Sequence, residues 1–316
     1  MRDRRYLATG LGQPIADYLA WKANEDGAKP VTVDTYERVL AQLAVVSGAG
    51  LDDLGIDHLR LVRDLRPPKS RYLVTAIYKD FARWLYEEGL TDMNVAGRLR
   101  YPKRDKPPLT GLFTDEEKGA IVNSQESARD RACVLLLLRA GIRKSELRLM
   151  QVRDVDLAEK SILVRRGKGG KARRIPIRGS LLDALETLIR WTLLPGLDRL
   201  MEPDDYLLYP ARAANQHNVG KHPNPKKPMA QSTAHRWWYG CLQRAGVVEQ
   251  KVTRGRRMHA TRHTYATDLG RATGWNMVAV QKNLGHSNIG LTVDTYTQFA
   301  FDDQAAAVEA LPEIEV

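Results

Sequence analysis

The sequence predicts a mainly helical protein with one small β-sheet, and three patterns lead to this fold class. Apolar residues recur at helical spacing along most of the chain, on both sides of a short linker. That linker, residues 103–111, contains two adjacent prolines among basic residues, a composition typical of extended chain. The pattern changes at SILVRRGKGGKARRIPI, where two β-prone runs flank glycines as in a β-hairpin. We therefore expect a helical first domain and an α+β second domain.

The helical segments set the expected domain boundaries. Four of them predict a bundle within residues 12–102, including a helix over LDDLGIDHLRLVRDL, residues 51–65. The last of the four stops at Gly89, because glycine is favoured just after a helix end. The second domain is expected over residues 112–300. An acidic tail, residues 301–316, follows it.

The charge of the chain indicates a polyanionic partner. Its formal net charge is +11, and residues 111–300 hold 31 Lys and Arg against 18 Asp and Glu. Such an excess favours nucleic-acid binding, although a basic protein without such a partner is the alternative. No apolar run is long enough to cross a membrane and the N-terminus lacks a secretory signal, so a cytoplasmic protein is expected. The two cysteines form no CxxC motif, which argues against a disulfide framework or a cysteine zinc site.

Two motifs of the second domain carry cations suited to a phosphodiester. In GIRKSEL, we expect Arg143 in the first turn of a helix, with Glu146 three residues later on the same face. A guanidinium oriented by a carboxylate can grip two phosphate oxygens. On the predicted hairpin, Lys168 lies at a glycine-rich tip, with the reach to protonate a departing oxygen. An ordinary surface ion pair and a solvated basic turn are the alternatives.

Two further motifs supply a second arginine and a nucleophile. In MHATRHTYAT, His259 can act as acid or base and Arg262, on the same helix face, can stabilise charge growing on phosphorus. His263 has metal-ligand spacing to His259, but the glutamate of HExxH is absent, so we expect a structural histidine and no metal. The stretch GHSNIGLTVDTYTQF holds His286 and Tyr296. A tyrosine hydroxyl has a pKa of about 10, so it attacks phosphorus only among cations and a base.

In their order and number, these motifs resemble the tyrosine recombinase (phage integrase) family. The resemblance covers nearly the whole chain, because the first domain is similar to the SAM-like core-binding domain of that family and the second to its catalytic domain. His286 and Tyr296 stand ten residues apart, one more than in the Xer pattern LGHxxxSTTxxY. Since the bundle begins near residue 12, the simple two-domain type without an arm-binding domain is expected.

The resemblance implies a role for each matched residue. Tyr296 is the nucleophile that forms a 3′-phosphotyrosyl link and releases a 5′-hydroxyl. Lys168 protonates the leaving 5′ oxygen, with Lys171 as the alternative, and Arg143 and Arg262 hold the non-bridging oxygens. The covalent ester keeps the bond energy and the cations replace a metal, so neither ATP nor any other cofactor is expected. The resemblance further implies that His259 assists proton transfer from Tyr296 and that His286 hydrogen-bonds the phosphate. Glu146 supports Arg143.

The resemblance also implies a two-domain clamp around duplex DNA. We expect a homotetramer on DNA attachment sites, a monomer or weak oligomer in free solution, and an accessory DNA-bending or directionality protein. The tail, residues 301–316, is expected either to dock on a neighbouring protomer or to fray. The side chains expected to contact the DNA backbone are Lys103, Arg104, Arg165, Arg166, Lys171, Arg173 and Arg174.

The expected function is site-specific recombination through a Holliday junction, for integration or excision of a phage or mobile element. The linker PPLTGLFTDEE and the DTY ending depart from the Xer pattern, which favours this role over a Xer-type chromosome or plasmid resolvase. The SAM-like first domain disfavours a type IB topoisomerase. The presence of every catalytic residue type disfavours a non-catalytic DNA-binding protein.

Overall fold

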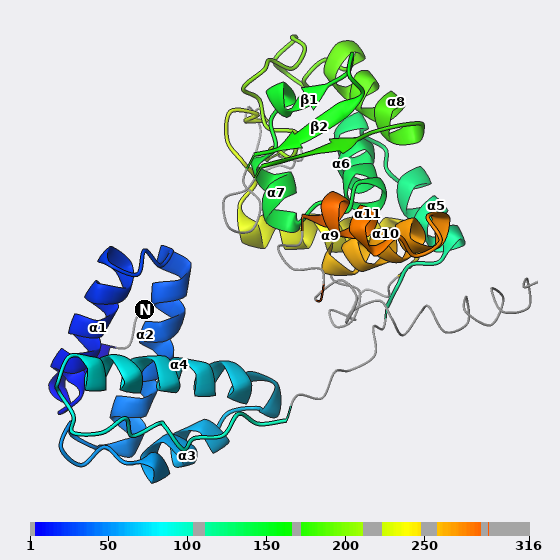
Figure 1. Cartoon of the computed structure of the whole chain (residues 1–316). Helices are drawn as coiled ribbons and strands as arrows, with labels where there is room; N and C mark the ends of the chain where they lie inside the picture. The colour runs from blue at the N-terminus through cyan, green and yellow to red at the C-terminus, as the bar shows by residue number, and fades with distance from the viewer. Residues whose placement is uncertain are drawn as a thin grey trace, which may run out of the picture. The chain divides into compact units, whose positions relative to one another are not determined.

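The computed structural model confirms the expected fold class, helices with one small sheet. It describes residues 4–103, 111–165, 172–210, 223–247, 258–285 and 290 of the chain. The chain divides into two compact units, Met1–Pro107 and Pro108–Val316, and the division falls within residues 103–111 (Figure 1). Across the described part, no helix combines the length and apolarity needed to span a bilayer.

The first unit is a helical bundle around its own apolar core. The predicted helix over residues 51–65 is shorter than expected, because residues 51–53 form a turn and Gly55, with an extended backbone, is the N-cap of α3. The last helix, α4, ends as predicted, with Gly89 at φ +67°. The elements are a 3-10 helix (Arg4–Ala8), α1 (Gly12–Asn24), α2 (Pro30–Ser47), α3 (Ile56–Asp64) and α4 (Pro68–Glu87).

A buried ion pair links α1 to α4. The Nζ of Lys22 lies 2.6 Å from Oδ2 of Asp80, which also accepts a hydrogen bond of 2.8 Å from the Tyr18 hydroxyl. The same ammonium lies 5.2 Å from the centroid of the Tyr36 ring. Desolvation raises the pKa of Asp80, but the hydrogen bonds from Lys22 and Tyr18 outweigh it and hold this pKa below its ordinary value. The pair is therefore ionised inside an aromatic surround.

The second unit packs helices around a three-stranded antiparallel sheet in the order β1-β2-β3. Both strands of the predicted hairpin are present, with Ile162 opposite Ile175. The sequence did not indicate β1, which has only two residues. The elements are α5 (Asp115–Asn123), α6 (Ala128–Arg139), α7 (Lys144–Leu149), β1 (Val155–Asp156), β2 (Ser161–Val164), β3 (Arg173–Pro176), α8 (Ser180–Glu186) with a π-helical turn (Thr187–Trp191), α9 (Gln231–Arg244), α10 (Met258–Ala272) and α11 (Met277–Leu284).

Helix α6 lies at the centre of the second core and contacts both α8 and α10 (Figure 1). Its run from Ala132 to Leu138 is buried on every side, as expected for a helix surrounded by other elements. The chain enters this unit at Phe113, whose ring meets the buried Trp238 edge-on at 6.0 Å. The backbone N–H of Phe113 donates to Thr264 of α10 at 3.0 Å. The entry point is thus attached to the helix that carries the predicted His259 and Arg262.

Replacing the acid of the buried pair should destabilise the first unit. In Asp80→Asn, the Lys22 ammonium stays buried and keeps the more exposed Asp26, at 2.9 Å, as an acidic partner. Breaking one side of a buried pair costs roughly 3 kcal/mol. Because the pKa of Asp80 is lowered on folding, the wild-type advantage is present above the ordinary value of 3.8 and is lost as the pH falls through the folded value.

Denaturant unfolding of the whole chain, followed by hydrogen exchange of peptides from the first unit, measures this loss. The matched control is Asp57→Asn, which removes an exposed pair with Arg60 on α3 and should change the free energy of unfolding by less than about 1 kcal/mol. Equal changes in the free energy of unfolding for the two variants would show that the buried pair stabilises the fold no more than the exposed pair does.

Candidate active site

Arg143 lies immediately before α7 and is its N-cap, with φ −74° and ψ 154°. The expectation that it falls inside the first helical turn is wrong. Glu146, in that first turn, reaches back to it: the backbone N–H of Arg143 donates to Oε2 at 2.7 Å and Nη1 donates to Oε1 at 2.7 Å. Reciprocal contacts of this kind satisfy the unpaired donors of a helix start. One carboxylate therefore orients both the backbone and the guanidinium of Arg143.

Glu146 has a second arginine partner, Arg173, the first residue of β3. Its Nη1 and Nη2 donate to Oε1 and Oε2, both at 2.9 Å, and its side chain is only 9% exposed. The prediction that Arg173 contacts the DNA backbone does not fit this placement, because protein acceptors occupy its guanidinium. Desolvation raises the pKa of Glu146, but the hydrogen bonds and charges of Arg173 and Arg143 outweigh it and lower the pKa to about 2. Glu146 is therefore a buried, ionised carboxylate.

Arg262 reaches the same region from α10. Its Nη1 donates to the carbonyl of Gly141 at 2.7 Å, two residues before Arg143 in the chain, and it is 2% exposed. Gly141 has φ +57°, and a Cβ on it would lie 2.2 Å from Cδ1 of Tyr265 on α10. Only glycine permits both that backbone conformation and that approach. The close packing of Gly141 on α10 brings the two predicted phosphate-binding arginines into one neighbourhood.

Two arginines also hold the end of α11. The carbonyl of Asn283 accepts from Nε of Arg173 at 3.0 Å, and the carbonyl of Leu284 accepts from Nη2 of Arg262 at 2.5 Å. The last carbonyls of a helix have no partner within it and carry partial negative charge, so cations are favoured there. Gly285 follows with φ +65°, and a Cβ on it would lie 2.8 Å from Cδ of Arg173. The backbone is thereby fixed up to the residue before the predicted His286.

Helix α10 carries a pair of histidines beside Arg262. The rings of His259 and His263 meet edge to face, with centroids 4.8 Å apart. Although His259 is exposed on the helix, desolvation by the surrounding protein, followed by the charges of Arg262 and Arg143, lowers its pKa below 6.5. Desolvation, followed by the charges of His259 and Arg262, lowers the pKa of His263 to about 4. Both rings are neutral at neutral pH, and a neutral imidazole can accept a proton.

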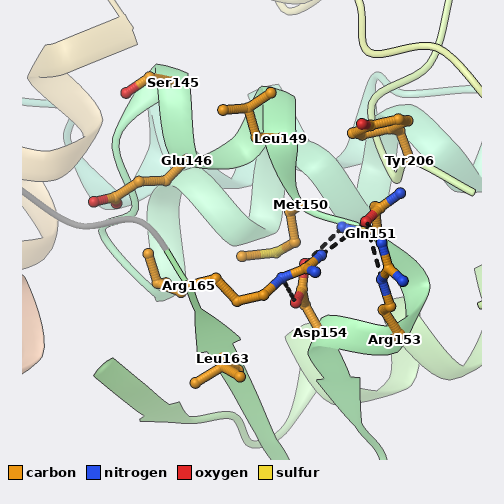
Figure 2. A pocket seen from close by; sticks show the side chains of 11 residues that line it. Ser145, Glu146, Leu149, Met150, Gln151, Arg153, Asp154, Leu163, Arg165 and Tyr206 are labelled. Atoms are coloured by element: carbon orange, nitrogen blue, oxygen red, sulfur yellow. Dashed lines mark hydrogen bonds and ion pairs between the residues drawn. The ribbon is translucent and has the colours of Figure 1, made fainter. Parts of the chain in front are cut away.

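The predicted DNA-backbone residues within the described part have different surroundings. Arg165 extends along a cavity of about 300 Å³ that Glu146 also lines, and its Nε lies 2.6 Å from Asp154 (Figure 2). Lys103 is exposed at the end of the first unit. Arg174 is also exposed, with a hydrogen bond of 3.0 Å to Ser161. All three side chains are exposed to solvent, and Arg165 and Arg174 also contact acceptors in their own unit.

Several predictions lie outside the described residues. Among the residues that are described, one group brings three metal-ligand atoms together, the carboxylates of Glu202, Asp204 and Asp205, and the ammonium of Lys226 already contacts all three. This cluster is remote in sequence from every predicted site residue. The site residues outside the described part are Arg104, Arg166, Lys168, Lys171, His286 and Tyr296, together with the tail at 301–316.

Comparison with known proteins gives a family match over most of the second unit. Residues 113–302 match the model of the phage integrase family. Tyrosine recombinase XerC of Yersinia pestis is 27% identical over 320 residues, covering 96% of this chain and 96% of the relative. Tyrosine recombinase XerD of Brucella suis is 29% identical over 303 residues, covering 88% of this chain and 90% of the relative.

Solved structures share the fold. The Tn1549 transposon integrase in complex with a circular intermediate DNA has a TM-score of 0.69 at 19% identity, covering 96% of this chain and 99% of that one. A lambda integrase dimer bound to a COC' core site has a TM-score of 0.64 at 16% identity, covering 97% and 99%. The match over more than half of the chain, together with the ordered motifs around Arg143 and Arg262, shows that the protein belongs to the phage integrase family of tyrosine site-specific recombinases.

Proposed function

We propose that the chain is a site-specific DNA recombinase that cleaves and rejoins DNA strands through a 3′-phosphotyrosyl intermediate. The observation that carries this proposal is that two arginines lie in the same region of the second unit. Glu146 orients Arg143, and Arg262 donates to the carbonyl of Gly141, two residues before Arg143. Two guanidiniums can stabilise the negative charge that grows on phosphorus during attack. They supply charge that other phosphoryl-transfer enzymes take from a metal ion.

In the proposed reaction, the Tyr296 oxygen forms a bond to the scissile phosphorus and the bond to the 5′ oxygen breaks. Neutral His259 assists removal of the phenolic proton, Lys168 gives a proton to the leaving 5′ oxygen, and His286 hydrogen-bonds the phosphate. The phosphotyrosyl ester keeps the bond energy, so a 5′-hydroxyl can attack it and rejoin the strand without ATP. The roles of Tyr296, Lys168 and His286 rest on their match to the family motifs. The phosphate contact of Arg262 rests on that match as well, because its Nη1 and Nη2 donate to the carbonyls of Gly141 and Leu284 and the residue is 2% exposed.

Duplex DNA is the proposed partner. The solved Tn1549 and lambda integrases are DNA complexes, and the net charge of +11 suits a polyanion. We further propose a homotetramer on paired attachment sites that passes through a Holliday junction, from a monomer or weak oligomer in free solution. An accessory DNA-bending or directionality protein, docking of the tail at 301–316 on a neighbouring protomer, and action in the cytoplasm of a bacterial host belong to the same proposal.

Two biological roles share this chemistry. Integration or excision of a phage or mobile element is the first, supported by the DTY ending and the linker that depart from the Xer pattern. A Xer-type resolvase is the second candidate, because XerC and XerD relatives align over 88–96% of this chain. An assay that compares the rate of recombination at the ends of a mobile element with the rate at sites that resolve chromosome dimers distinguishes the two roles.

Replacing Tyr296 with phenylalanine should abolish covalent attachment to DNA. A nicked suicide duplex carrying the attachment site, incubated in EDTA, should trap a protein–DNA adduct through a 3′ phosphate with wild type, because the reaction needs no metal. Tyr239→Phe, a change on α9, is the matched control and should still form the adduct. Denaturing electrophoresis measures the yield.

Three outcomes of that assay carry different meanings. An adduct with Tyr296→Phe would move the nucleophile to another residue. Binding without an adduct, on a site shown to be occupied, would favour a non-catalytic DNA-binding protein. Relaxation of supercoiled DNA without exchange between partner sites would favour a type IB topoisomerase.

The cleavage rate should depend on pH through His259. The pKa of His259 is lowered below 6.5. In the DNA complex, the single negative charge of the phosphodiester does not cancel the two positive charges of Arg143 and Arg262, so this pKa should stay low. Because the neutral ring accepts the proton, the single-turnover rate should stay flat on going from pH 8 to 6.5 and fall at more acid pH. His259→Asn should be slow and lose this acid limb. A wild-type rate that increases as the pH falls would contradict the role of the neutral ring.

Replacing the linker lysine should weaken binding to all sequences alike. Lys103→Gln removes an exposed positive charge at the start of the linker, and this charge is expected to contact a phosphate. The slope of log K against log salt should become shallower by about 0.9 for the one lost contact. Anisotropy titrations with the attachment site and with a random duplex, at several salt concentrations, test this. A loss confined to the attachment site would instead indicate readout of bases.

A further inference from the structure

Arg173 is a single planar group that bridges three elements of the second unit. From the start of β3, its two Nη atoms bind Glu146 on α7, and its Nε binds the Asn283 carbonyl at the end of α11. A guanidinium presents its five donors in a rigid plane, so fixing two of these acceptors places the third. The positions of α7 and the end of α11 are therefore coupled through one side chain.

The carboxylate that orients Arg143 is shared with Arg173. Oε1 accepts from Nη1 of both arginines, and Oε2 accepts from the backbone of Arg143 and from Nη2 of Arg173. These four donors match the roughly four acceptor positions of a carboxylate. The Glu146 side chain is 2% exposed, so water cannot replace a missing donor readily. Without Arg173, each oxygen keeps its bond to Arg143 but loses its partner on β3, so the Glu146–Arg143 pair is no longer anchored to the sheet.

The end of α11 is coupled to the same residue. Arg173 and Arg262 bind the consecutive carbonyls of Asn283 and Leu284, and the Arg173 side chain packs against Gly285. The Gly285 backbone has φ +65°, which sets the direction in which the chain leaves the helix. Without Arg173, the Asn283 carbonyl would lose this donor, and of the two arginines Arg262 alone would still bind the end of α11.

We propose that Arg173 is a positioning residue for DNA cleavage, acting through Glu146 on Arg143 and through Asn283 on the end of α11, and that it does not bind the DNA backbone. The inference rests on the proposed recombinase function and adds to it a residue that never touches the substrate. Lysine cannot replace it, because one compact ammonium does not bridge a carboxylate and a carbonyl in a fixed plane.

The test compares DNA affinity with the rate of cleavage in Arg173→Lys, which keeps the charge. At saturating suicide duplex, its single-turnover rate should fall about 10- to 100-fold, the effect expected of a misplacement near 1 Å. Its Kd and the salt slope of binding should match wild type. Arg178→Lys, which also keeps the charge, is the matched control: this exposed arginine just beyond β3 donates to the carbonyls of Lys160 and Ile177, and the change should leave both quantities unchanged.

A second substrate separates positioning of Arg143 from a general loss of packing. A methylphosphonate at the scissile position carries no negative charge and has less need of the arginine clamp, so the defect of Arg173→Lys should shrink on it. An equal defect on both substrates would overturn the route through Arg143. The charge-balanced double variant Glu146→Gln with Arg173→Gln should be no slower than Glu146→Gln alone, if the two residues act as one unit.

The remaining outcomes are distinct. A salt slope of the double variant shallower than that of Glu146→Gln alone, with unchanged cleavage by Arg173→Lys at saturation, would make Arg173 a phosphate contact and overturn the proposal. Wild-type adduct formation with equally fast cleavage by Arg173→Lys would overturn the positioning role alone. Absence of an adduct with wild type on an occupied site would overturn the recombinase function itself, and the positioning role with it.

Discussion

The site depends on one buried negative charge. The Glu146 carboxylate is almost without solvent, and it stays ionised because two arginines and a backbone N–H surround it. Burying a carboxylate with fewer donors is costly, so the partners stabilise one another only as a complete set. Since the same carboxylate orients Arg143, the charge arrangement that could receive a phosphate is built on an interaction that the substrate does not touch.

Helix ends complete this arrangement. The carbonyls of Gly141 and Leu284 both accept from Arg262, which thus joins the chain after α6 to the end of α11. Gly141 and Gly285 each have positive φ and each packs against a side chain where a Cβ has no room. Part of the positive charge of the second unit therefore serves to assemble the protein. The same arginines also act on α10: desolvation, followed by the charges of Arg262 and Arg143, lowers the pKa of His259.

Each of the two units folds around its own core. The first buries the Lys22–Asp80 pair among aromatic rings, and the second surrounds an apolar α6 with helices and a small sheet. Each has its own core, which is the physical basis for treating them as domains. The excess of positive charge belongs mostly to residues 111–300, so charge alone predicts a larger contribution to DNA affinity from the second unit than from the first.

Local sequence determined the elements and the chemistry of the motifs. Apolar periodicity and the glycine after α4 act within a few residues, so the helices and the hairpin strands could be predicted, as could the grouping of Arg143 with Glu146. Only tertiary structure decided that Arg173 binds Glu146, because these residues lie on separate elements and no short-range pattern connects them. A basic hairpin residue looks alike in sequence whether it faces phosphate or a buried carboxylate. The register of β3 and the packing of α11 select the second.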